Sequence, residues 1–313
     1  MGRSYQDVLG RIAKLYYEYN YTHQQIADLI GWNRVKVTRA LQEARQQGIV
    51  RITVCSDEPL FVEEERTLCR RYGLDQTWIG PPSQGGQADL ENLATVGAEA
   101  VQQLTDPGSQ VAVGVSETLA AIAHTVKPSE LMPTTTFVPL QGTNPGLVTP
   151  PTPSNIAAVF AAAFGGRSHA LAAPVFTGSP EMLRLLEQDE NVQRAFETAA
   201  GSDMALVGVG GTAERSSIIL RADLTEGDAE ALRRKGAVGD INARFFDING
   251  EPVETERTAL VLGPSLEDFK KIPVRVAAAA GPLKIEALRG ALNGGLITSL
   301  VTDEPTAQAL LSS

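Results

Sequence analysis

The chain is poor in cysteine and histidine, the residues from which metal centres, disulfides and nucleophilic triads are most often built. It contains two cysteines, Cys55 and Cys69, and three scattered histidines, His23, His124 and His169. The cysteines lack metal-ligand spacing relative to any histidine cluster, and the histidines suggest no triad. We therefore expect no metal, no cofactor and no catalytic residue, and reduced thiols in a cytoplasmic protein.

Long apolar runs are also missing. No stretch approaches the roughly 20 apolar residues of a membrane span, and the chain begins too polar for a signal peptide. The hydrophobic content of 43% and the charged content of 20% are ordinary for a soluble globular protein. This composition argues against a membrane protein, and the length suits one small domain plus a larger one of about 250 residues.

Positive charge is scarce over most of the chain. The net charge of −10 argues against a nucleic-acid coat or a membrane-surface binder. Residues 1–55 are the exception, since eight Lys and Arg against four Asp and Glu give them a net charge of +4 and leave −14 for the rest. Electrostatic attraction for DNA is thus confined to one end of the chain.

Residues 22–48 carry the most informative motif, which reads as two short helices around a tight turn. Thr22 can cap the first helix, Gly31 permits the turn, and Asn33 can cap the second. The apolar positions repeat at helical spacing on one side of each helix: Ile26, Ala27 and Ile30, then Val37, Ala40, Leu41 and Ala44. This pattern is typical of a helix-turn-helix, whose second helix enters the major groove. The alternative is an ordinary helical hairpin inside a larger core.

The second helix presents polar side chains at its start and on the side away from its apolar positions. Arginine offers a fork for guanine or phosphate, so we expect Arg34 and Arg39 to contact or approach bases and Lys36 to contact phosphate. Gln24, near the start of the first helix, is a further phosphate candidate. The predicted DNA-contact set is Gln24, Asn33, Arg34, Val35, Lys36, Thr38, Arg39 and Gln42.

The segments around this motif complete a small head. Residues 5–20 are expected to form a leading helix, and residues 49–54 a short strand that closes the head. The charged segment 59–72 is expected to form a helix, ended by Gly73, that links two domains and pairs with its copy in a dimer. The predicted domains are therefore a DNA-binding head (1–56), a linker helix (57–73) and an effector-binding and oligomerisation domain (74–313).

Beyond the linker, short apolar runs alternate with helical stretches. This alternation predicts a doubly wound α/β domain, with a mainly parallel sheet covered on both faces. The expected strands are 111–115, 135–140, 168–174, 204–210, 258–263, 274–280 and 296–302. The expected helices are 89–105, 117–126, 154–164, 179–200, 225–234 and 283–292. The Pro-rich stretch 145–153 is interpreted as an ordered loop near a strand end.

Ligands of such sheets sit outside the carboxyl ends of the strands, and several loops there are rich in glycine and hydroxyl groups. Ser116, Glu117 and Thr118 open a helix, where backbone N–H groups favour an anion. Asp240 could bind sugar hydroxyls, and Lys284 could add a cation. The alternatives are turn-forming glycines, a capping aspartate and a solvated lysine. The predicted effector-binding set is Ser116, Thr118, Gly142, Thr143, Asn144, Gly210, Gly211, Asp240 and Lys284.

Over essentially its whole length the chain resembles the SorC/DeoR-type sugar-binding transcriptional regulators. The resemblance rests on the head, YTHQQIADLIGWNRVKVTRALQEARQQGIVRITV, and on ALVGVGG, GAVGDINARFFDINGEPV, SLEDFKKIPVRVAAAAG and GALNGGLITSLVTDEPTAQALL in order. It implies a body similar to sugar-phosphate isomerases and deaminases that senses rather than catalyses. It also implies a phosphorylated sugar effector, with phosphate near the first two strand loops and Lys284 and with sugar near Asp240, and a homotetramer built as a dimer of dimers on operator DNA.

The first strand loop departs from the pattern of the family it resembles. That loop commonly contains an aromatic residue and a second glycine between its serine and threonine, whereas here it reads Gly114-Val115-Ser116-Glu117-Thr118. An acidic Glu117 beside a phosphate is electrostatically unfavourable. Two readings stay open: an unphosphorylated sugar or polyol, or a phosphate held instead by Gly142, Thr143 and Asn144.

The sequence therefore predicts a DNA-binding transcriptional regulator of carbohydrate metabolism genes, controlled by a small sugar, polyol or sugar phosphate. One alternative is a sugar-phosphate isomerase or deaminase with an accessory DNA-binding head. Such an enzyme needs a positioned base, and only Asp240 and Glu117 are candidates. Another is a constitutive DNA-binding protein whose body only oligomerises.

Overall fold

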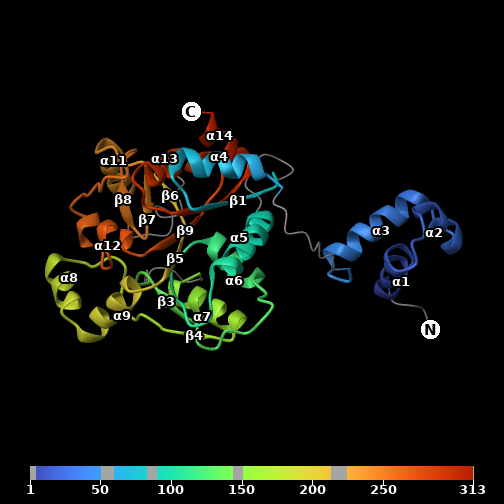
Figure 1. Ribbon diagram of the computed structural model, residues 1–313, viewed down its shortest axis with the longest axis horizontal. Coiled ribbons are helices and arrows are strands. Elements are labelled where there is room, and N and C mark those ends of the chain that lie inside the picture. Colours follow the sequence, from blue (N-terminus) through green and yellow to red (C-terminus); the bar gives the residue numbers. More distant parts are fainter. Residues whose placement is uncertain (1–4, 51–59, 83–89, 144–150, 213–223, 313) are drawn as a thin grey trace. The chain divides into compact units, whose positions relative to one another are not determined.

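The computed structural model describes residues 5–50, 60–82, 90–143, 151–212 and 224–312 (Figure 1). The chain divides into two compact units, Met1–Glu58 and Pro59–Ser313. Each unit has its own hydrophobic core, so each is considered separately below.

The first unit contains three helices, α1 (Tyr5–Tyr17), α2 (His23–Ile30) and α3 (Arg34–Gln46). The predicted apolar positions meet in one core made of residues of these helices, which is the arrangement of a helix-turn-helix. The fully buried members of this core are Leu9, Ile12, Ala13, Ile26, Ala27, Val37, Ala40, Leu41 and Ala44. The helix-turn-helix arrangement is confirmed.

The turn between α2 and α3 is fixed by local chemistry. The Thr22 side chain accepts a hydrogen bond from Gln25 N, and the Gln25 side chain accepts one from Thr22 N, which closes a capping box. Gly31 ends α2 with φ of 73°, a left-handed conformation that glycine adopts without steric cost. Asn33 caps α3 by accepting from Lys36 N at 2.8 Å. Most of the expected strand 49–54 and all but the end of the loop 145–153 lie outside the described residues.

Helix α4 (Val62–Tyr72) ends at Gly73 and packs within the second unit. Its residue Leu68 is fully buried. Tyr72 Oη donates to Leu310 O at 2.9 Å, and Glu65 Oε1 accepts from Ile79 N at 3.0 Å. These contacts tie the expected linker helix to the C-terminal helix and to an edge strand of the sheet.

The second unit is built on a seven-stranded sheet in which every neighbouring pair is parallel, as predicted. Its strands in spatial order are β1 (Gln76–Gly80), β10 (Ser299–Asp303), β9 (Val274–Ala278), β5 (Met204–Val207), β2 (Gln110–Val113), β3 (Thr136–Pro139) and β4 (Arg167–Ser168). The chain runs outward from β2 to β3 and β4, and then from β5 to β9 and β10 on the other side. The order therefore reverses between β2 and β5.

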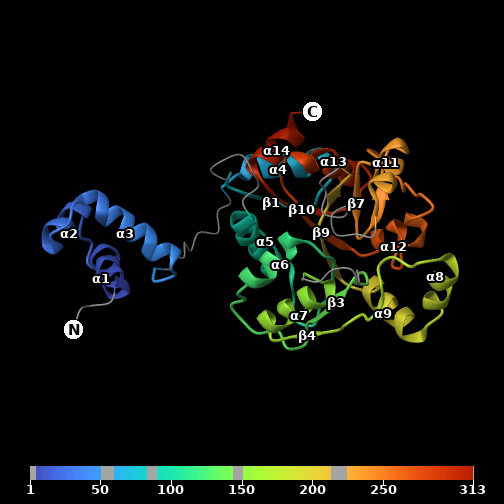
Figure 2. The same ribbon diagram turned by 180° about the vertical axis from the view of Figure 1, so that it is seen from behind.

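Helices cover both faces of this sheet (Figures 1 and 2). Alternate strand residues separate two cores: Val111 and Val113 enter one, and Ala112 enters the other. The first core is closed by α5 (Leu90–Leu104), α6 (Glu117–Thr125) and α7 (Pro153–Phe164). The second is closed by α4, α9 (Glu190–Ala200), α12 (Leu266–Lys270), α13 (Ile285–Asn293) and α14 (Glu304–Leu311).

A small antiparallel sheet, absent from the sequence prediction, adjoins the main one. It consists of β6 (Gly210–Gly211), β7 (Gly239–Ile241) and β8 (Arg244–Phe246). Gly210 pairs with Asp240, and Ile241 pairs with Arg244. Phe245 and Val253 help to form a separate core with α11 (Glu226–Arg234), which contributes Leu232.

Several other expected elements differ from the structure. Residues 258–263 are not a strand of the sheet but a 3-10 turn (Thr258–Leu260) and an isolated bridge at Val261. Of the run 168–174, only the first residue belongs to a strand, β4. The helix expected over 179–200 is broken into α8 (Pro180–Glu187) and α9, because Asp189 caps a new helix through Asn191 N and Val192 N.

Candidate DNA-contact and effector sites

The exposed side of α3 carries the side chains best placed to meet DNA. Arg34, Val35, Arg39 and Gln42 are exposed, and Val35 shows 61% of its surface to solvent. Within the part of the chain that the structure describes, the Arg34, Arg39 and Gln42 side chains form no hydrogen bond or ion pair. Their donors thus face outward beside an apolar valine, which suits hydrogen bonding to guanine and contact with a thymine methyl.

Four other predicted DNA-contact residues have partners within the head. Asn33 uses its side-chain oxygen as the cap of α3, and Gln24 Nε2 donates to Asp28 Oδ1 at 2.9 Å. Lys36 Nζ lies 4.1 Å from the centre of the Trp32 ring. Thr38 Oγ1 donates to Arg34 O at 3.1 Å. The contacts of Asn33, Lys36 and Thr38 lie at the start of α3, and that of Gln24 lies within α2. Contact with DNA stays a prediction for all eight residues of the set.

The reversal of strand order between β2 and β5 defines the place where a ligand of the second unit is expected, outside the carboxyl ends of these strands. The loop after β2 enters α6, and the segment after β5 enters β6. The structure brings five predicted effector residues to this edge: Ser116, Gly210, Gly211, Asp240 and Lys284.

Ser116 starts α6 and touches the segment after β5. Its Oγ accepts from Leu119 N at 2.9 Å, which caps the helix. A β-carbon on Gly208 would lie 2.9 Å from Ser116 Cβ, so only glycine allows this approach. The N-terminus of α6 is thereby fixed beside the extension of β5. Thr118, the second residue of α6, is buried.

Asp240 is buried in the small sheet, where only 7% of it is exposed. Its Oδ2 accepts from Ala243 N at 3.2 Å, whereas its Oδ1 has no hydrogen-bond partner among the described residues. A side chain at Gly210 would overlap Oδ1, because the two positions are paired across β6 and β7. Burial raises the pKa of Asp240 to about 6, although the Ala243 N–H and the Lys284 ammonium both lower it.

Lys284 faces this carboxylate from the turn after β9 (Pro282–Lys284). Burial lowers the pKa of its ammonium, and the charges of Asp240 and Glu117 raise it. Leu283 O would lie 2.7 Å from a β-carbon on Gly211, so this turn packs against β6. The segments after β2, β5 and β9 thus bring together the ammonium of Lys284 and the carboxylates of Asp240 and Glu117.

Asn242 is a site residue that the sequence reasoning missed. It occupies the turn between β7 and β8 with φ of 52°, and its Oδ1 would lie 2.5 Å from a β-carbon on Gly114. The turn therefore reaches the end of β2. The signal available in the sequence was an asparagine two residues after Asp240, a residue type that tolerates positive φ.

The loop after β3 follows the neighbouring strand of the sheet. Thr143 N donates to Ala173 O at 2.8 Å, and Gly142 packs so closely against Ala173 and Pro174 that a side chain would overlap their backbone. Gln141 is buried, and its Oε1 has no partner among the residues described here. Asn144 lies outside the described residues.

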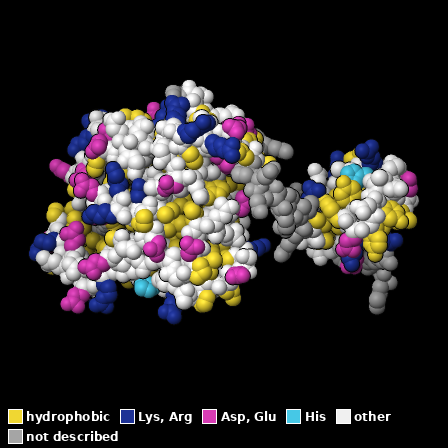
Figure 3. All heavy atoms as spheres, in the orientation of Figure 1, with side chains coloured by type: hydrophobic (Ala, Val, Ile, Leu, Met, Phe, Trp, Pro, Cys, Tyr) yellow, Lys and Arg dark blue, Asp and Glu magenta, His cyan; other side chains and the backbone are white. Residues whose placement is uncertain are grey.

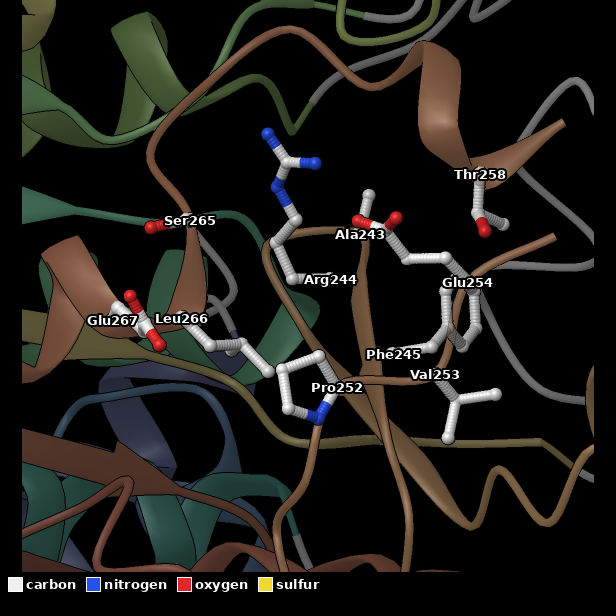
Figure 4. A pocket seen from close by; sticks show the side chains of 10 residues that line it. All are labelled: Ala243, Arg244, Phe245, Pro252, Val253, Glu254, Thr258, Ser265, Leu266 and Glu267. Atoms are coloured by element: carbon white, nitrogen blue, oxygen red, sulfur yellow. The ribbon is translucent and has the colours of Figure 1, made fainter. Parts of the chain in front are cut away.

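A separate cavity of about 140 Å³ lies beside Ala243, Arg244 and Phe245, where β8 begins (Figure 4). Phe245, Pro252, Val253 and Leu266 line it, with Glu254 and Glu267 at its sides. It contains none of the predicted effector residues. Arg244, at its wall, is committed to backbone carbonyls, since Nε donates to Pro264 O at 3.0 Å and a terminal nitrogen to Gly263 O at 2.6 Å.

Other classes of site find little support. Among the described residues, no group of three or more His, Cys, Asp or Glu side chains could hold a metal ion. None of the described helices is long and apolar enough to cross a membrane. On the face of the second unit seen in Figure 3, acidic and basic side chains alternate.

Known proteins share both halves of this architecture. Residues 60–312 match the family model of a sugar-binding domain, and residues 7–70 match that of a Crp-like helix-turn-helix domain. The chain belongs to the SorC/DeoR-type sugar-binding transcriptional regulators.

Individual relatives match this chain over nearly the whole length of both proteins. The transcriptional regulator LsrR of Escherichia coli is 30% identical over 100% of this chain and 96% of its own. The deoxyribonucleoside regulator of Bacillus subtilis is 28% identical over 100% of this chain and 99% of its own. The full-length sorbitol operon regulator SorC from Klebsiella pneumoniae superposes with a TM-score of 0.78 at 26% identity, covering 99% of this chain and 100% of that one. Transcriptional regulation through a helix-turn-helix and a sugar-binding domain is therefore the function of this family member.

Proposed function

We propose that this regulator binds operator DNA of carbohydrate metabolism genes through α3 and binds a small sugar, polyol or sugar phosphate at the carboxyl ends of β2, β5 and β9. The observation that carries the effector proposal is the buried Asp240, whose Oδ1 lacks a partner among the described residues and which lies beside Lys284. An unpaired buried carboxylate oxygen is costly, and a ligand hydroxyl would satisfy it.

Control of DNA binding requires that the effector prefer one arrangement of the protein. A ligand with equal affinity for both arrangements would shift nothing. We propose that occupancy at the end of the main sheet changes how two heads are spaced relative to operator half-sites. The protein acts as a homotetramer, a dimer of dimers, in the cytoplasm, where its operator is found. Light scattering with and without operator duplex measures the assembly.

The enzyme alternative deserves one test because Asp240, with a pKa near 6, would suit proton transfer. We propose that the site senses rather than catalyses, which agrees with relatives named as transcriptional regulators. Turnover of a sugar phosphate that is lost in Asp240→Asn would establish the isomerase or deaminase reading.

The main test is a titration of operator binding in the presence of single compounds. Thermal stabilisation of the full chain first selects binders from a panel of free sugars, polyols and sugar phosphates. We expect at least one binder to change operator affinity in the wild type and not in Asp240→Asn. If no binder changes operator affinity, the protein is a DNA-binding protein without ligand control.

A further inference from the structure

A carboxylate of the chain itself, that of Glu117, lies at the N-terminus of α6. Glu117 is the first residue of this nine-residue helix, directly after the Ser116 cap. Backbone N–H groups and the helix dipole make this end favourable for negative charge, whether from a side chain or from a ligand. An incoming anion would therefore meet a carboxylate that occupies the same favourable field.

Lys284, the basic group of this site, faces the same carboxylate. Its ammonium interacts with both Asp240 and Glu117. The packing of Gly208 on Ser116 and of Gly211 on Leu283 brings the loops that carry Glu117 and Lys284 against one short segment after β5. With both carboxylates charged, one ammonium leaves this cluster with a net charge of −1, which repels a phosphate dianion.

The unpaired acceptor in the site calls for a hydroxyl group on the effector. Asp240 Oδ1 is buried and has no partner among the described residues. Only a hydrogen-bond donor can satisfy it, and a sugar or polyol hydroxyl is a donor. A phosphate group offers acceptor oxygens alone, so the Asp240 carboxylate selects the hydroxyl part of an effector. The charge of Glu117 is what disfavours a phosphate group on it.

We propose that the effector of this regulator is an uncharged sugar or polyol, and that Glu117 occupies, from within the chain, the anion position between the α6 N-terminus and Lys284. This inference rests on the proposed effector site. It predicts that the chain discriminates against phosphorylated ligands through a single side chain, and that removal of the Glu117 charge opens the position to phosphate.

The test uses the full chain and inorganic phosphate as the probe, followed in thermal unfolding and in calorimetric titration. Glu117→Gln keeps the size of the side chain and removes its charge. The matched control is Glu190→Gln, because Glu190 is likewise the exposed first residue of a capped helix, α9, which contributes no residue to this site. The double variant Glu117→Gln/Lys284→Met tests whether any gain is located at Lys284.

We expect Glu117→Gln to bind phosphate about tenfold or more tightly than the wild type, because a like charge has been removed from the helix end beside Lys284. Glu190→Gln should behave as the wild type, and the double variant should lose the gain. If Glu117→Gln unfolds, Glu117→Ser, which retains a residue suited to a helix start, takes its place. Equal phosphate affinity in the wild type and the variant overturns the proposal.

A second arm separates this inference from the proposed function. Free polyols and their phosphate esters are compared as pairs for binding to the wild type. Tighter binding of a phosphate ester than of its parent polyol overturns the inference while leaving sugar-controlled regulation intact. The proposed function itself fails on a different readout, which is an operator affinity that no binder changes.

Discussion

Arg34 and Arg39 are the residues of α3 that we expect to contribute most to operator binding. Both side chains are exposed and have no intramolecular partner among the described residues. Each can present a guanidinium to a base edge or phosphate. Arg34→Ala or Arg39→Ala should weaken operator binding by about 1–3 kcal/mol for each lost base contact. Fluorescence anisotropy with operator and random duplexes measures the change, which should be larger for the operator.

Lys36→Ala serves as the contrasting variant. Lys36 lies over Trp32, from where it can supply charge to a phosphate without reading a base. Its loss should weaken binding to both duplexes alike and lower the salt dependence. Unchanged operator affinity in all three variants would contradict the proposed docking of α3.

Asp240 makes the stability of the second unit depend on pH. Its pKa rises from 3.8 to about 6 on folding because burial disfavours the charged form. The native state therefore binds more protons than the unfolded state between these values. Stability should fall as pH rises from about 4 to about 6 and then level off, a loss of about 3 kcal/mol at most.

Asp240→Asn should remove this dependence. At pH 7 the variant is expected to unfold at a higher temperature than the wild type, and below pH 4 the two should converge. Asp106→Asn, a change at an exposed aspartate of a loop, is the matched control. A wild-type advantage at pH 7 would show that the buried carboxylate is stabilised in its charged form.

The same residues show how far a site can be predicted from a sequence. Ser116 and Lys284 were predicted because loops after apolar runs meet at one edge of a parallel sheet. Asp240 was predicted as a carboxylate between a glycine and an apolar run, and it lies in β7 at the same edge. Asn242 was missed, since its approach to Gly114 depends on a turn with positive φ that no periodicity reports. The acceptor left unpaired on Asp240 is likewise visible only after folding.

At the scale of elements, continuous apolar runs were read correctly and short or polar strands were not. The buried strands β3, β5 and β9 lie within predicted runs, and β2 and β10 each extend one residue beyond theirs, at Gln110 and Asp303. Strand β1 was missed because Gln76 and Thr77 break its apolar pattern. The run 258–263 is apolar because Val261 packs in the small core, not because it joins the sheet. Burial, rather than strand pairing, is what the pattern detects.

The pairing of β6 with β7 yields an element-scale prediction. Gly210→Ala places a methyl group where Asp240 Oδ1 lies, so the paired strands must separate or the carboxylate must turn away. Effector binding should be lost, with the head and its DNA affinity intact. Gly178→Ala is the control, because a β-carbon there meets nothing within 4 Å. Calorimetric titration with an identified binder measures the effect, and normal binding in Gly210→Ala would contradict the placement of the ligand.

At the scale of the whole molecule, binding to DNA and binding to effector reside in units with separate cores. Charge separates them too, since residues 1–55 carry +4 and the remainder −14. For the effector to control DNA binding, effector and operator must favour different conformations or the same conformation of one protein. The coupling between the two sites is a free energy, and it acts equally in both directions.

This reciprocity gives a quantitative expectation for the intact protein. If a compound lowers operator affinity by some factor, saturating operator duplex must lower the affinity for that compound by the same factor. Two titrations measure it: duplex binding at zero and saturating compound, and compound binding at zero and saturating duplex. Asp240→Asn should abolish both effects together, whereas Arg34→Ala should weaken duplex binding without changing compound affinity in the absence of DNA. Unequal factors would mean that the compound acts on the duplex or on the assembly state instead of on the site at the end of the sheet.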